Sequence, residues 1–188
     1  MFSLRNSIFS ALLIMALLLS GWSFFIIYHP HSAIQEDLGK PDAFMEDVIA
    51  TFIDKQGKPT LKIAAPKMSH YMENDATKIV KPLLTLYRKS PQPWHLTADH
   101  ARTLQGISQI FLQDNVIIDH PGDDQNEKTT LLTPSLIVYP EKQLALTEDP
   151  VIINQPNTKI HAVGMNADLS SGAIKLLSQT QGEYSVQE

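Results

Sequence analysis

The sequence predicts an all-β domain of antiparallel strands behind one apolar segment near the N-terminus. Three observations support this prediction. Eleven of the 12 prolines lie after residue 40, which leaves few windows long enough for a helix. Short runs in the same part of the chain alternate between apolar and polar residues, as half-buried strands do. A pattern that begins at a small residue also recurs there at nearly regular intervals.

Composition and charge exclude several classes of protein. The chain has 188 residues, is 43% hydrophobic and contains no cysteine. It can therefore bury a core, which argues against disorder, and it holds neither a disulfide framework nor a cysteine-ligated metal. All 20 acidic residues but only 14 of the 15 basic ones follow residue 28, so this part is net negative. A net negative domain is disfavoured as a nucleic-acid binder.

The apolar segment predicts a membrane anchor. Residues 8–28 form an uninterrupted stretch without a charge, close in length to the roughly 20 residues that span a bilayer as a helix. A cleaved signal peptide is the competing interpretation, but its apolar region usually has about 7 to 15 residues. Arg5 precedes the segment and no Lys or Arg follows it before Lys40. The positive-inside rule then places residues 1–7 in the cytoplasm and the remainder outside.

Residues 29–42 predict a tether, and residues 43–188 the exported domain. The tether contains two prolines, a glycine and mixed charge, without an apolar period. The alternating apolar positions beyond it predict strands at Leu61, Ile63 and Ala65; Trp94, Leu96 and Ala98; Ile110 and Leu112; Val116 and Ile118; Leu144 and Leu146; and Val151 and Ile153.

The repeated pattern begins at a small residue that follows a strand. These anchor residues are Ala65, Ala98, Thr133 and Ala162. A second position, which we call the opening position, lies at the same distance from each anchor, and the first three units are expected to open a new strand there. The opening positions are Pro82, Asn115, Pro150 and Gln179. Turns are expected between strands at Glu73-Asn74-Asp75, Gly106, Glu141-Lys142 and Ser170-Ser171-Gly172.

Two further positions of each unit, between the anchor and the opening position, share one face of a strand. We expect their side chains to point into a common apolar interior; they are Thr77 and Ile79, Ile110 and Leu112, and Ile174 and Leu176. In the third unit the apolar pair, Leu144 and Leu146, comes one residue earlier, which predicts a bulge or a shortened turn there. The pattern alone leaves open whether the interior is a closed core or a binding groove.

The chain resembles the LptC family of lipopolysaccharide export proteins over nearly its whole length. The resemblance rests on the N-terminal anchor, on the repeats, and on the order of Asp54 to Gly57, Lys81-Pro82-Leu83, Trp94 to Asp99, Asp114-Asn115-Val116, Asp149-Pro150-Val151 and residues 160–176. It implies an open, twisted β-jelly roll, V-shaped in section, whose hydrophobic groove holds lipid acyl chains. Family positions for the groove are Val48, Ile79, Ile174 and Tyr184. The shared strand face of the equivalent repeat positions independently favours Ile79 and Ile174 as groove residues, together with Ile110, Leu112 and Leu176.

The resemblance also implies partners and a location. Lipopolysaccharide is expected to arrive from an ATP-driven inner-membrane transporter complex of the LptB, LptF and LptG type. It then passes to a periplasmic bridge protein of the LptA type, which pairs with the strand edge near Tyr184. The protein is expected in the inner membrane with one span and a periplasmic C-terminal domain. The chain has no G-x-x-x-x-G-K-[ST] motif, so the energy must come from that partner.

Catalysis is not expected from this sequence. The seven histidines show no H-x-x-x-H or H-E-x-x-H spacing, and G-x-S-x-G is absent. We therefore expect no metal and no cofactor. The alternative function is a membrane-tethered scaffold that binds another envelope protein without carrying lipid. An interior closed by side chains favours the scaffold, whereas the low aromatic content after Tyr28 favours an open groove.

Overall fold

The computed structural model describes residues 40–87, 92–104, 106–122 and 127–185, which belong to one compact unit, Leu38–Glu188. The predicted anchor at residues 8–28 lies outside the described part, as do residues 1–7, which are predicted to be cytoplasmic, and the predicted tether up to residue 39. Among the described residues, no helix has the length and apolar character needed to cross a membrane.

The described residues form strands and one 3-10 turn, the latter at Met72–Asn74. The strands of the first half are β1 (Ala43–Ile53), β2 (Pro59–Tyr71), β3 (Ala76–Val80), β4 (Leu83–Leu86), β5 (Trp94–Thr97) and β6 (His100–Leu104). Those of the second half are β7 (Gln109–His120), β8 (Thr129–Tyr139), β9 (Leu144–Gln155), β10 (Thr158–Asp168) and β11 (Ala173–Tyr184). The all-β prediction is confirmed.

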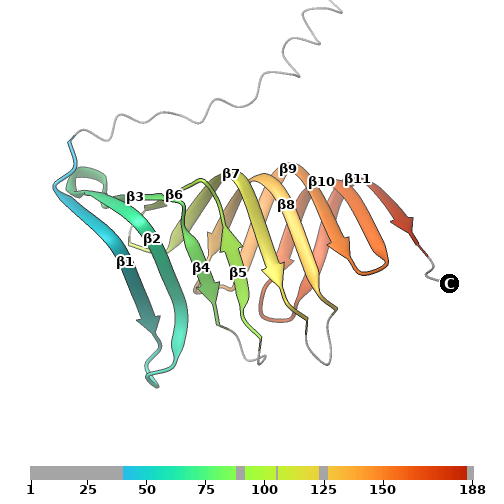
Figure 1. Cartoon of the computed structure of the whole chain (residues 1–188), viewed down its shortest axis with the longest axis horizontal. Coiled ribbons are helices and arrows are strands. Elements are labelled where there is room, and N and C mark those ends of the chain that lie inside the picture. The colour runs from blue at the N-terminus through green and yellow to red at the C-terminus, as the bar shows by residue number, and fades with distance from the viewer. Residues whose placement is uncertain (1–39, 88–91, 105, 123–126, 186–188) are drawn as a thin grey trace, which may run out of the picture. The chain divides into compact units, whose positions relative to one another are not determined.

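The strands form one antiparallel sheet, in which most pairings join strands that follow each other in the chain (Figure 1). Two strands of this sheet are interrupted. β3 and β4 both pair with β2 and are separated at Lys81-Pro82, while β5 and β6 both pair with β7 and are separated at Ala98-Asp99. Among the described strands, β1 pairs with β2 alone and β11 with β10 alone. The sheet therefore ends in two unpaired edges.

A row of irregular backbone crosses the sheet at mid-strand, and we call this row the crease. Left-handed backbone marks it at Asp47, Lys81, Asp114, Asn115, Gly164 and Gln179. Register shifts accompany it in the pairings of β7 with β8, β8 with β9 and β9 with β10. Such bulges bend a strand and increase its twist. The crease divides the sheet into leaf 1, which contains β3 and β6, and leaf 2, which contains β4 and β5; each longer strand contributes one half to each leaf.

The repeat seen in the sequence corresponds to this crease. Each anchor residue lies on the leaf 2 side of it, and the opening positions lie in or next to it. Pro82 precedes a new strand, β4, as expected. Asn115, Pro150 and Gln179 instead lie inside β7, β9 and β11, because those strands continue across the bulge. The pattern thus marks where strands bend as well as where they begin.

The expected turns are present. Asp75, Gly106, Gln143 and Gly172 adopt positive φ angles where the chain reverses between strands. Such angles favour glycine, and they are tolerated by Asp and Asn better than by bulky residues.

Alternation places one face of each leaf in the interior. The predicted inward residues of β2, β5 and β7 are buried, including Leu61, Leu96 and Val116. The expectation for the third repeat is wrong: Ala145 and Thr147 are buried, while Leu144 and Leu146 lie on the other face and are only partly buried. The inward positions of this unit keep the spacing from the anchor found in the other units, but they hold small side chains, while the two leucines lie on the other face.

Each leaf has one apolar face, and the two leaves bury these faces against each other. The buried apolar residues of both leaves form one continuous cluster that extends from β2 to β10. Residues on opposite sides of the fold are joined in it, since the Trp94 indole of leaf 2 donates to the carbonyl oxygen of Leu169, which follows the last residue of leaf 1 in β10.

Candidate lipid-binding interior

The predicted groove residues line the interior, but they differ in accessibility. Ile79, Ile110 and Leu112 of leaf 1 are 2%, 0% and 0% exposed and belong to the continuous cluster. They lie at the middle of the sheet, where both leaves are complete. In this conformation they have almost no access to solvent. A ligand reaches them only if the leaves separate.

The remaining predicted residues lie toward the two ends of the sheet. Val48 of β1 pairs with the buried Ala65 and is partly buried. At the other end, Ile174 and Leu176 pack against the cluster from β11 and are also partly buried. Tyr184, which pairs with Thr158, is 71% exposed. The interior is thus accessible at its ends and filled at its middle.

The first strand contributes two inward residues that were not predicted. Ala50 pairs with Ile63 and Phe52 with Leu61, so both share the inward face with Val48. Their alternation is visible in the sequence as Val48, Ala50 and Phe52. The signal was missed because Ile49 and Ile53, on the other face, are also apolar.

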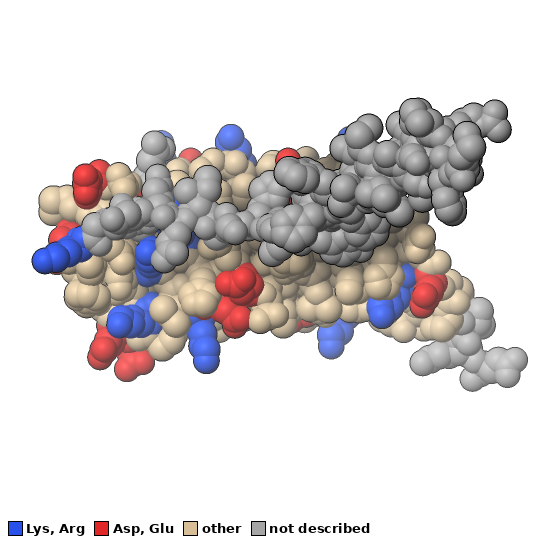
Figure 2. Space-filling model, turned by 90° about the horizontal axis from the view of Figure 1, so that it is seen from above, with Lys and Arg blue, Asp and Glu red and all other residues tan. Residues whose placement is uncertain are grey.

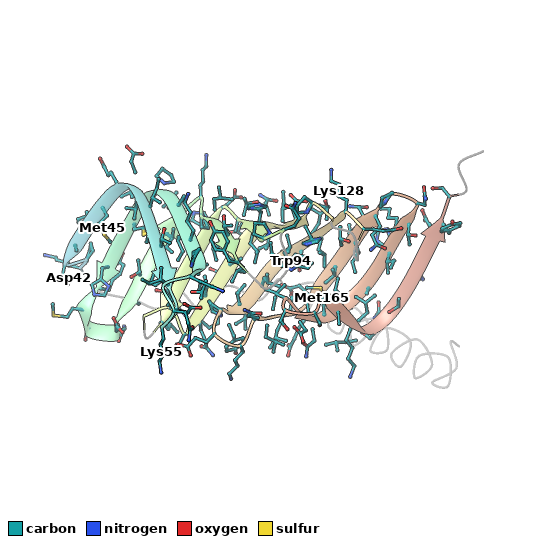
Figure 3. The ribbon with its side chains drawn as sticks, turned by 90° about the horizontal axis from the view of Figure 1, so that it is seen from below. Asp42, Met45, Lys55, Trp94, Lys128 and Met165 are labelled. Carbon is teal, nitrogen blue, oxygen red and sulfur yellow. The ribbon has the colours of Figure 1, made fainter. Side chains whose placement is uncertain are left out.

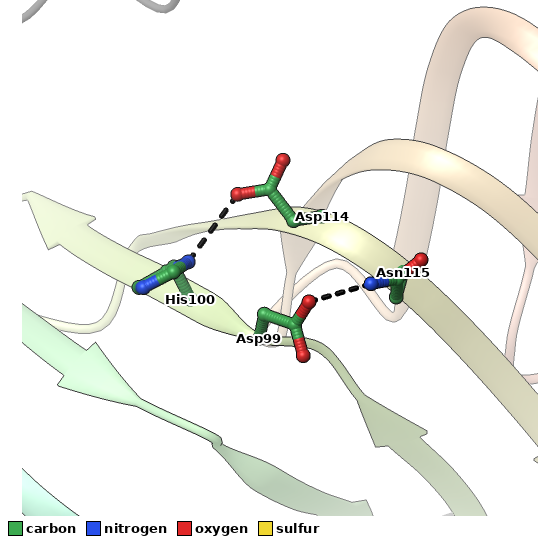
Figure 4. A network of polar contacts seen from close by, with 4 residues as sticks. All are labelled: Asp99, His100, Asp114 and Asn115. Carbon is green, nitrogen blue, oxygen red and sulfur yellow. Dashed lines mark hydrogen bonds and ion pairs between the residues drawn. The ribbon is translucent and has the colours of Figure 1, made fainter.

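The crease is held by polar contacts. The Lys81 amide donates to the Asp99 carbonyl oxygen at 2.8 Å, and the Asp99 amide donates to the Asp114 carbonyl oxygen at 2.9 Å. Side chains add a second set: Asn115 Nδ2 donates to Asp99 Oδ2 at 2.6 Å, and His100 Nδ1 lies 3.3 Å from Asp114 Oδ2 (Figure 4). These bonds satisfy backbone and side-chain groups that the bulges take out of the regular ladder.

Other repeats use different groups at the same place. The Ser135 hydroxyl donates to the Asp149 carboxylate, and the Ser178 hydroxyl donates to the Val163 carbonyl oxygen at 3.0 Å. The crease therefore has a polar surface in several units, while the apolar side chains point away from it into the interior. Within the described residues, no cluster of three or more His, Asp or Glu side chains is arranged to hold a metal ion.

The side of the fold opposite the crease, which we call the mouth, is closed near the middle of the sheet. Trp94 is the first residue of β5 and His120 the last of β7, so both lie at the far end of leaf 2. Their rings pack with centroids 4.7 Å apart. Trp94 Nε1 donates to the Leu169 carbonyl oxygen of leaf 1 at 3.2 Å. Trp94 and Met165, which share the cluster, are labelled near the middle of the long axis in Figure 3.

Hydrogen bonds connect the residues that close the mouth to both leaves. The Leu169 amide donates to the Gln143 carbonyl oxygen at 2.7 Å, which fixes the loop after β10 to the turn between β8 and β9. On the other leaf, the Gly122 amide donates to His120 Nδ1 at 3.2 Å. Trp94 belongs to a motif noted in the sequence, but its partner was not predicted there, because Leu169 lies 75 residues away.

A shallow hollow of about 370 Å³ lies outside the interior, at the crease of β1 to β4. Its lining includes three cross-strand neighbours on the outward face, Ile49, Ala64 and Leu83.

On the visible surface in Figure 2, acidic and basic side chains are interspersed. The described side chains that are visible in this view therefore form no patch of one sign of the kind that nucleic-acid binding requires.

Comparison with known proteins assigns the chain to a family. A family model described as "Lipopolysaccharide-assembly, LptC-related" matches residues 12–185, most of the chain. The chain belongs to this LptC-related family. LptC proteins are non-catalytic components of the lipopolysaccharide transport machinery of the cell envelope, so this LptC-related chain is a transport component and not an enzyme.

Among solved structures, the LptC-related chain is similar to LptH from Pseudomonas aeruginosa, described as the LptA-homologous periplasmic component of the lipopolysaccharide transport device. The two share 7% identity and a TM-score of 0.52, over 68% of this chain and 95% of LptH. At this identity the likeness shows the fold, an antiparallel twisted sheet of the LptA and LptH kind. No curated protein sequence matches the chain.

Proposed function

We propose that this LptC-related protein carries lipopolysaccharide between its two leaves. It accepts the lipid from an ATP-driven transporter complex of the LptB, LptF and LptG type and passes it to a periplasmic bridge protein of the LptA type. The observation that supports this most directly is the interior, an apolar surface that runs through the sheet between two unpaired edges. Each acyl CH₂ group kept out of water contributes about 0.8 kcal/mol to binding.

The accessible ends give the lipid its entry and exit in this proposal. Val48 lies at the β1 end and Ile174, Leu176 and Tyr184 lie at the β11 end, where inward side chains retain solvent access. Ile79, Ile110 and Leu112 line the path between them. An unpaired edge strand exposes backbone donors and acceptors, so β11 can extend its sheet into that of a bridge protein.

Residues 8–28 supply the anchor in the proposed arrangement. A single span with residues 1–7 in the cytoplasm puts the β domain in the periplasm, and residues 29–42 then connect the two. Fourteen residues span at most roughly 50 Å even when fully extended. The domain thus stays close to an extraction site in the same membrane.

Photo-crosslinking in cells tests whether the interior carries lipid. A photoreactive residue is placed in turn at Ile79, Ile174 and Tyr184, with the exposed turn residue Lys142 as control. We expect lipopolysaccharide adducts at the three apolar positions and none at Lys142. Adducts at Ile79 have particular weight, because this residue is 2% exposed and requires separated leaves.

The scaffold remains the second candidate, since the filled middle of the interior favours it. A domain whose apolar residues are buried against one another needs no lipid to complete its core. A folded, expressed protein without adducts at any position would favour this scaffold and count against lipid transport.

A further inference from the structure

The filled middle of the interior poses a physical problem for lipid passage, and the mouth of the fold suggests its solution. We propose that Trp94 is a barrier residue: with His120 and Leu169 it clasps the two leaves together and divides the lipid path into two separate ends. Lipid crosses the middle only when the bond between the Trp94 indole and Leu169 breaks. This inference rests on the proposed lipid transport.

The position of the clasp supports this role. The crease joins the leaves through continuous backbone, so the leaves can separate only at the mouth. Trp94 is 3% exposed, and Leu169, whose carbonyl oxygen accepts its indole hydrogen bond at 3.2 Å, is 2% exposed. A hydrogen bond buried in apolar surroundings leaves two unsatisfied groups when it breaks, unless water or a ligand replaces it. The bond therefore resists opening until something enters.

The chemistry of the entering molecule fits this requirement. An acyl chain can cover the apolar residues that separation exposes, among them Leu96 and Ile110, which are both 0% exposed. It cannot accept the indole N–H. Water or the polar part of an amphiphile at the mouth can do so. A lipid that presents both apolar chains and oxygen atoms is thus suited to open the clasp, whereas a plain hydrocarbon is not.

Three variants distinguish the clasp from general stability. Trp94→Phe keeps a ring against His120 but loses the indole donor, and Trp94→Ala removes both. Tyr71→Ala is the control for general stability, because it removes a ring from a second buried cluster, formed with Ala76 and Leu104, that is separate from the interior cluster. The folding of each variant is checked by circular dichroism and by its unfolding midpoint.

The readout is a ratio of adducts in the full-length protein in its membrane. A photoreactive residue at Ile110 reports lipid in the middle, and one at Ile174 reports lipid at the β11 end. We expect Trp94→Phe to raise the ratio of Ile110 to Ile174 adducts by about fivefold, the population change that one ordinary hydrogen bond controls. Trp94→Ala should raise the ratio at least as much, and Tyr71→Ala should leave it near that of the wild type.

A second measurement needs no change in the clasp itself. The chain has two tryptophans, so Trp22→Phe leaves Trp94 as the only one. Acrylamide should quench this tryptophan weakly in the absence of lipid and more strongly when lipopolysaccharide is added to the purified full-length protein.

The outcomes separate the two proposals. An unchanged ratio in both Trp94 variants, with adducts still forming at Ile174, would overturn the clasp and leave lipid transport standing. Quenching that lipopolysaccharide leaves unchanged, despite adducts at Ile110, would also overturn it. The absence of adducts at every position in every variant would overturn lipid transport and the clasp together.

Discussion

At the scale of single residues, the fold depends on a few positions where the backbone leaves the regular strand. Gly164 is one of them: its φ is 78°, and a Cβ built there would lie 2.8 Å from Leu177 Cδ1 and 3.1 Å from Leu177 Cβ. It allows β10 to bend at the crease while Leu177 of β11 lies over it. A side chain at this position conflicts with both the conformation and the neighbour.

Gly164→Ala should therefore lower the free energy of unfolding by more than the left-handed backbone alone explains, which is about 1–2 kcal/mol. Gly57→Ala is a matched control, because Gly57 has the same φ of 78° and no atom within 4 Å of the added Cβ. Chemical denaturation of both variants measures the difference. Equal losses would mean that Leu177 moves aside and that contact across the crease matters little.

Asp168 organises the turn between β10 and β11. Its Oδ1 accepts hydrogen bonds from the Ser170 hydroxyl at 2.6 Å, the Ser170 amide at 2.8 Å and the Ser171 amide at 3.1 Å. These bonds favour the ionised carboxylate and lower the pKa of Asp168 below its ordinary value, with the Ser170 hydroxyl as the largest cause.

The sign of the resulting pH dependence follows from linkage. A folded-state pKa below the unfolded one contributes stability that is present above the unfolded pKa and is lost as the pH falls through the folded pKa. We expect the stability difference between wild type and Asp168→Asn to be largest near neutral pH and to shrink in acid below the ordinary carboxyl range. Thermal unfolding over a pH series measures it, and a difference that stays constant with pH would contradict this explanation.

At the scale of elements, β11 is the strand whose edge is free at the C-terminal end of the sheet. Successive backbone amides point to opposite sides of a strand. Gly182 and Glu183 pair with Ile160 and Lys159 of β10, so one of these two amides faces β10 and the other faces the free edge.

A proline at each of these two positions should therefore act differently. The substitution that removes the amide facing β10 should lower the unfolding midpoint, because it breaks the ladder inside the domain. The other should leave the midpoint nearly unchanged and abolish capture of a bridge protein that pairs with this edge. Thermal unfolding and pull-down of an LptA-type protein with Gly182→Pro and Glu183→Pro test this. Capture that survives in both variants would place the partner elsewhere.

The elements also show how far the sequence predicts the fold. Alternation located the strands because inward positions such as Leu61 and Ile63 meet the facing leaf, and turns were found because Gly106 and Gly172 carry a local backbone requirement. The third repeat was assigned to the wrong face because Leu144 and Leu146 are apolar on the outside. Periodicity detects hydrophobicity but does not tell which leaf, if any, covers it.

The interior was predictable only in part for the same reason. The alternation of side chains along the strands predicted that Ile79, Ile110 and Leu112 point inward, and all three are buried in the structure. The clasp was not predictable, because the indole of Trp94 and the carbonyl of Leu169 are 75 residues apart and a backbone oxygen leaves no mark in a sequence. A low aromatic content suggested an open groove, yet a single tryptophan at the mouth is enough to close its middle.

At the scale of the whole domain, the two leaves share every long strand, and this determines how the interior can open. Hydrogen bonds between strands lie within each leaf or along the crease. Separation at the mouth therefore exposes side chains without breaking a ladder. If the interior opened by removal of an edge strand, the hydrogen-bond ladder between that strand and its neighbour would break.

Hydrogen exchange distinguishes the two modes of opening. With added lipopolysaccharide, we expect the amides of β7 to β10 to keep their protection, while exposure of Trp94 increases. Loss of protection along β10 and β11 would mean that lipid enters by unzipping the edge, and separation at the mouth would then be wrong. The protein without lipid, at the same detergent concentration, provides the control.

The pairing of successive strands also bears on how the chain acquires its structure. Because most strands pair with a predecessor nearby in the chain, a strand can be added to the sheet as soon as it has left the membrane or the ribosome, without waiting for later residues. Neighbouring pairings of this kind close short loops and keep the entropy loss of each step small. The bond from Trp94 to Leu169 is an exception, since it spans 75 residues. The clasp can therefore form only once Leu169 is present, so a growing chain that ends before this residue cannot yet close the mouth through Trp94.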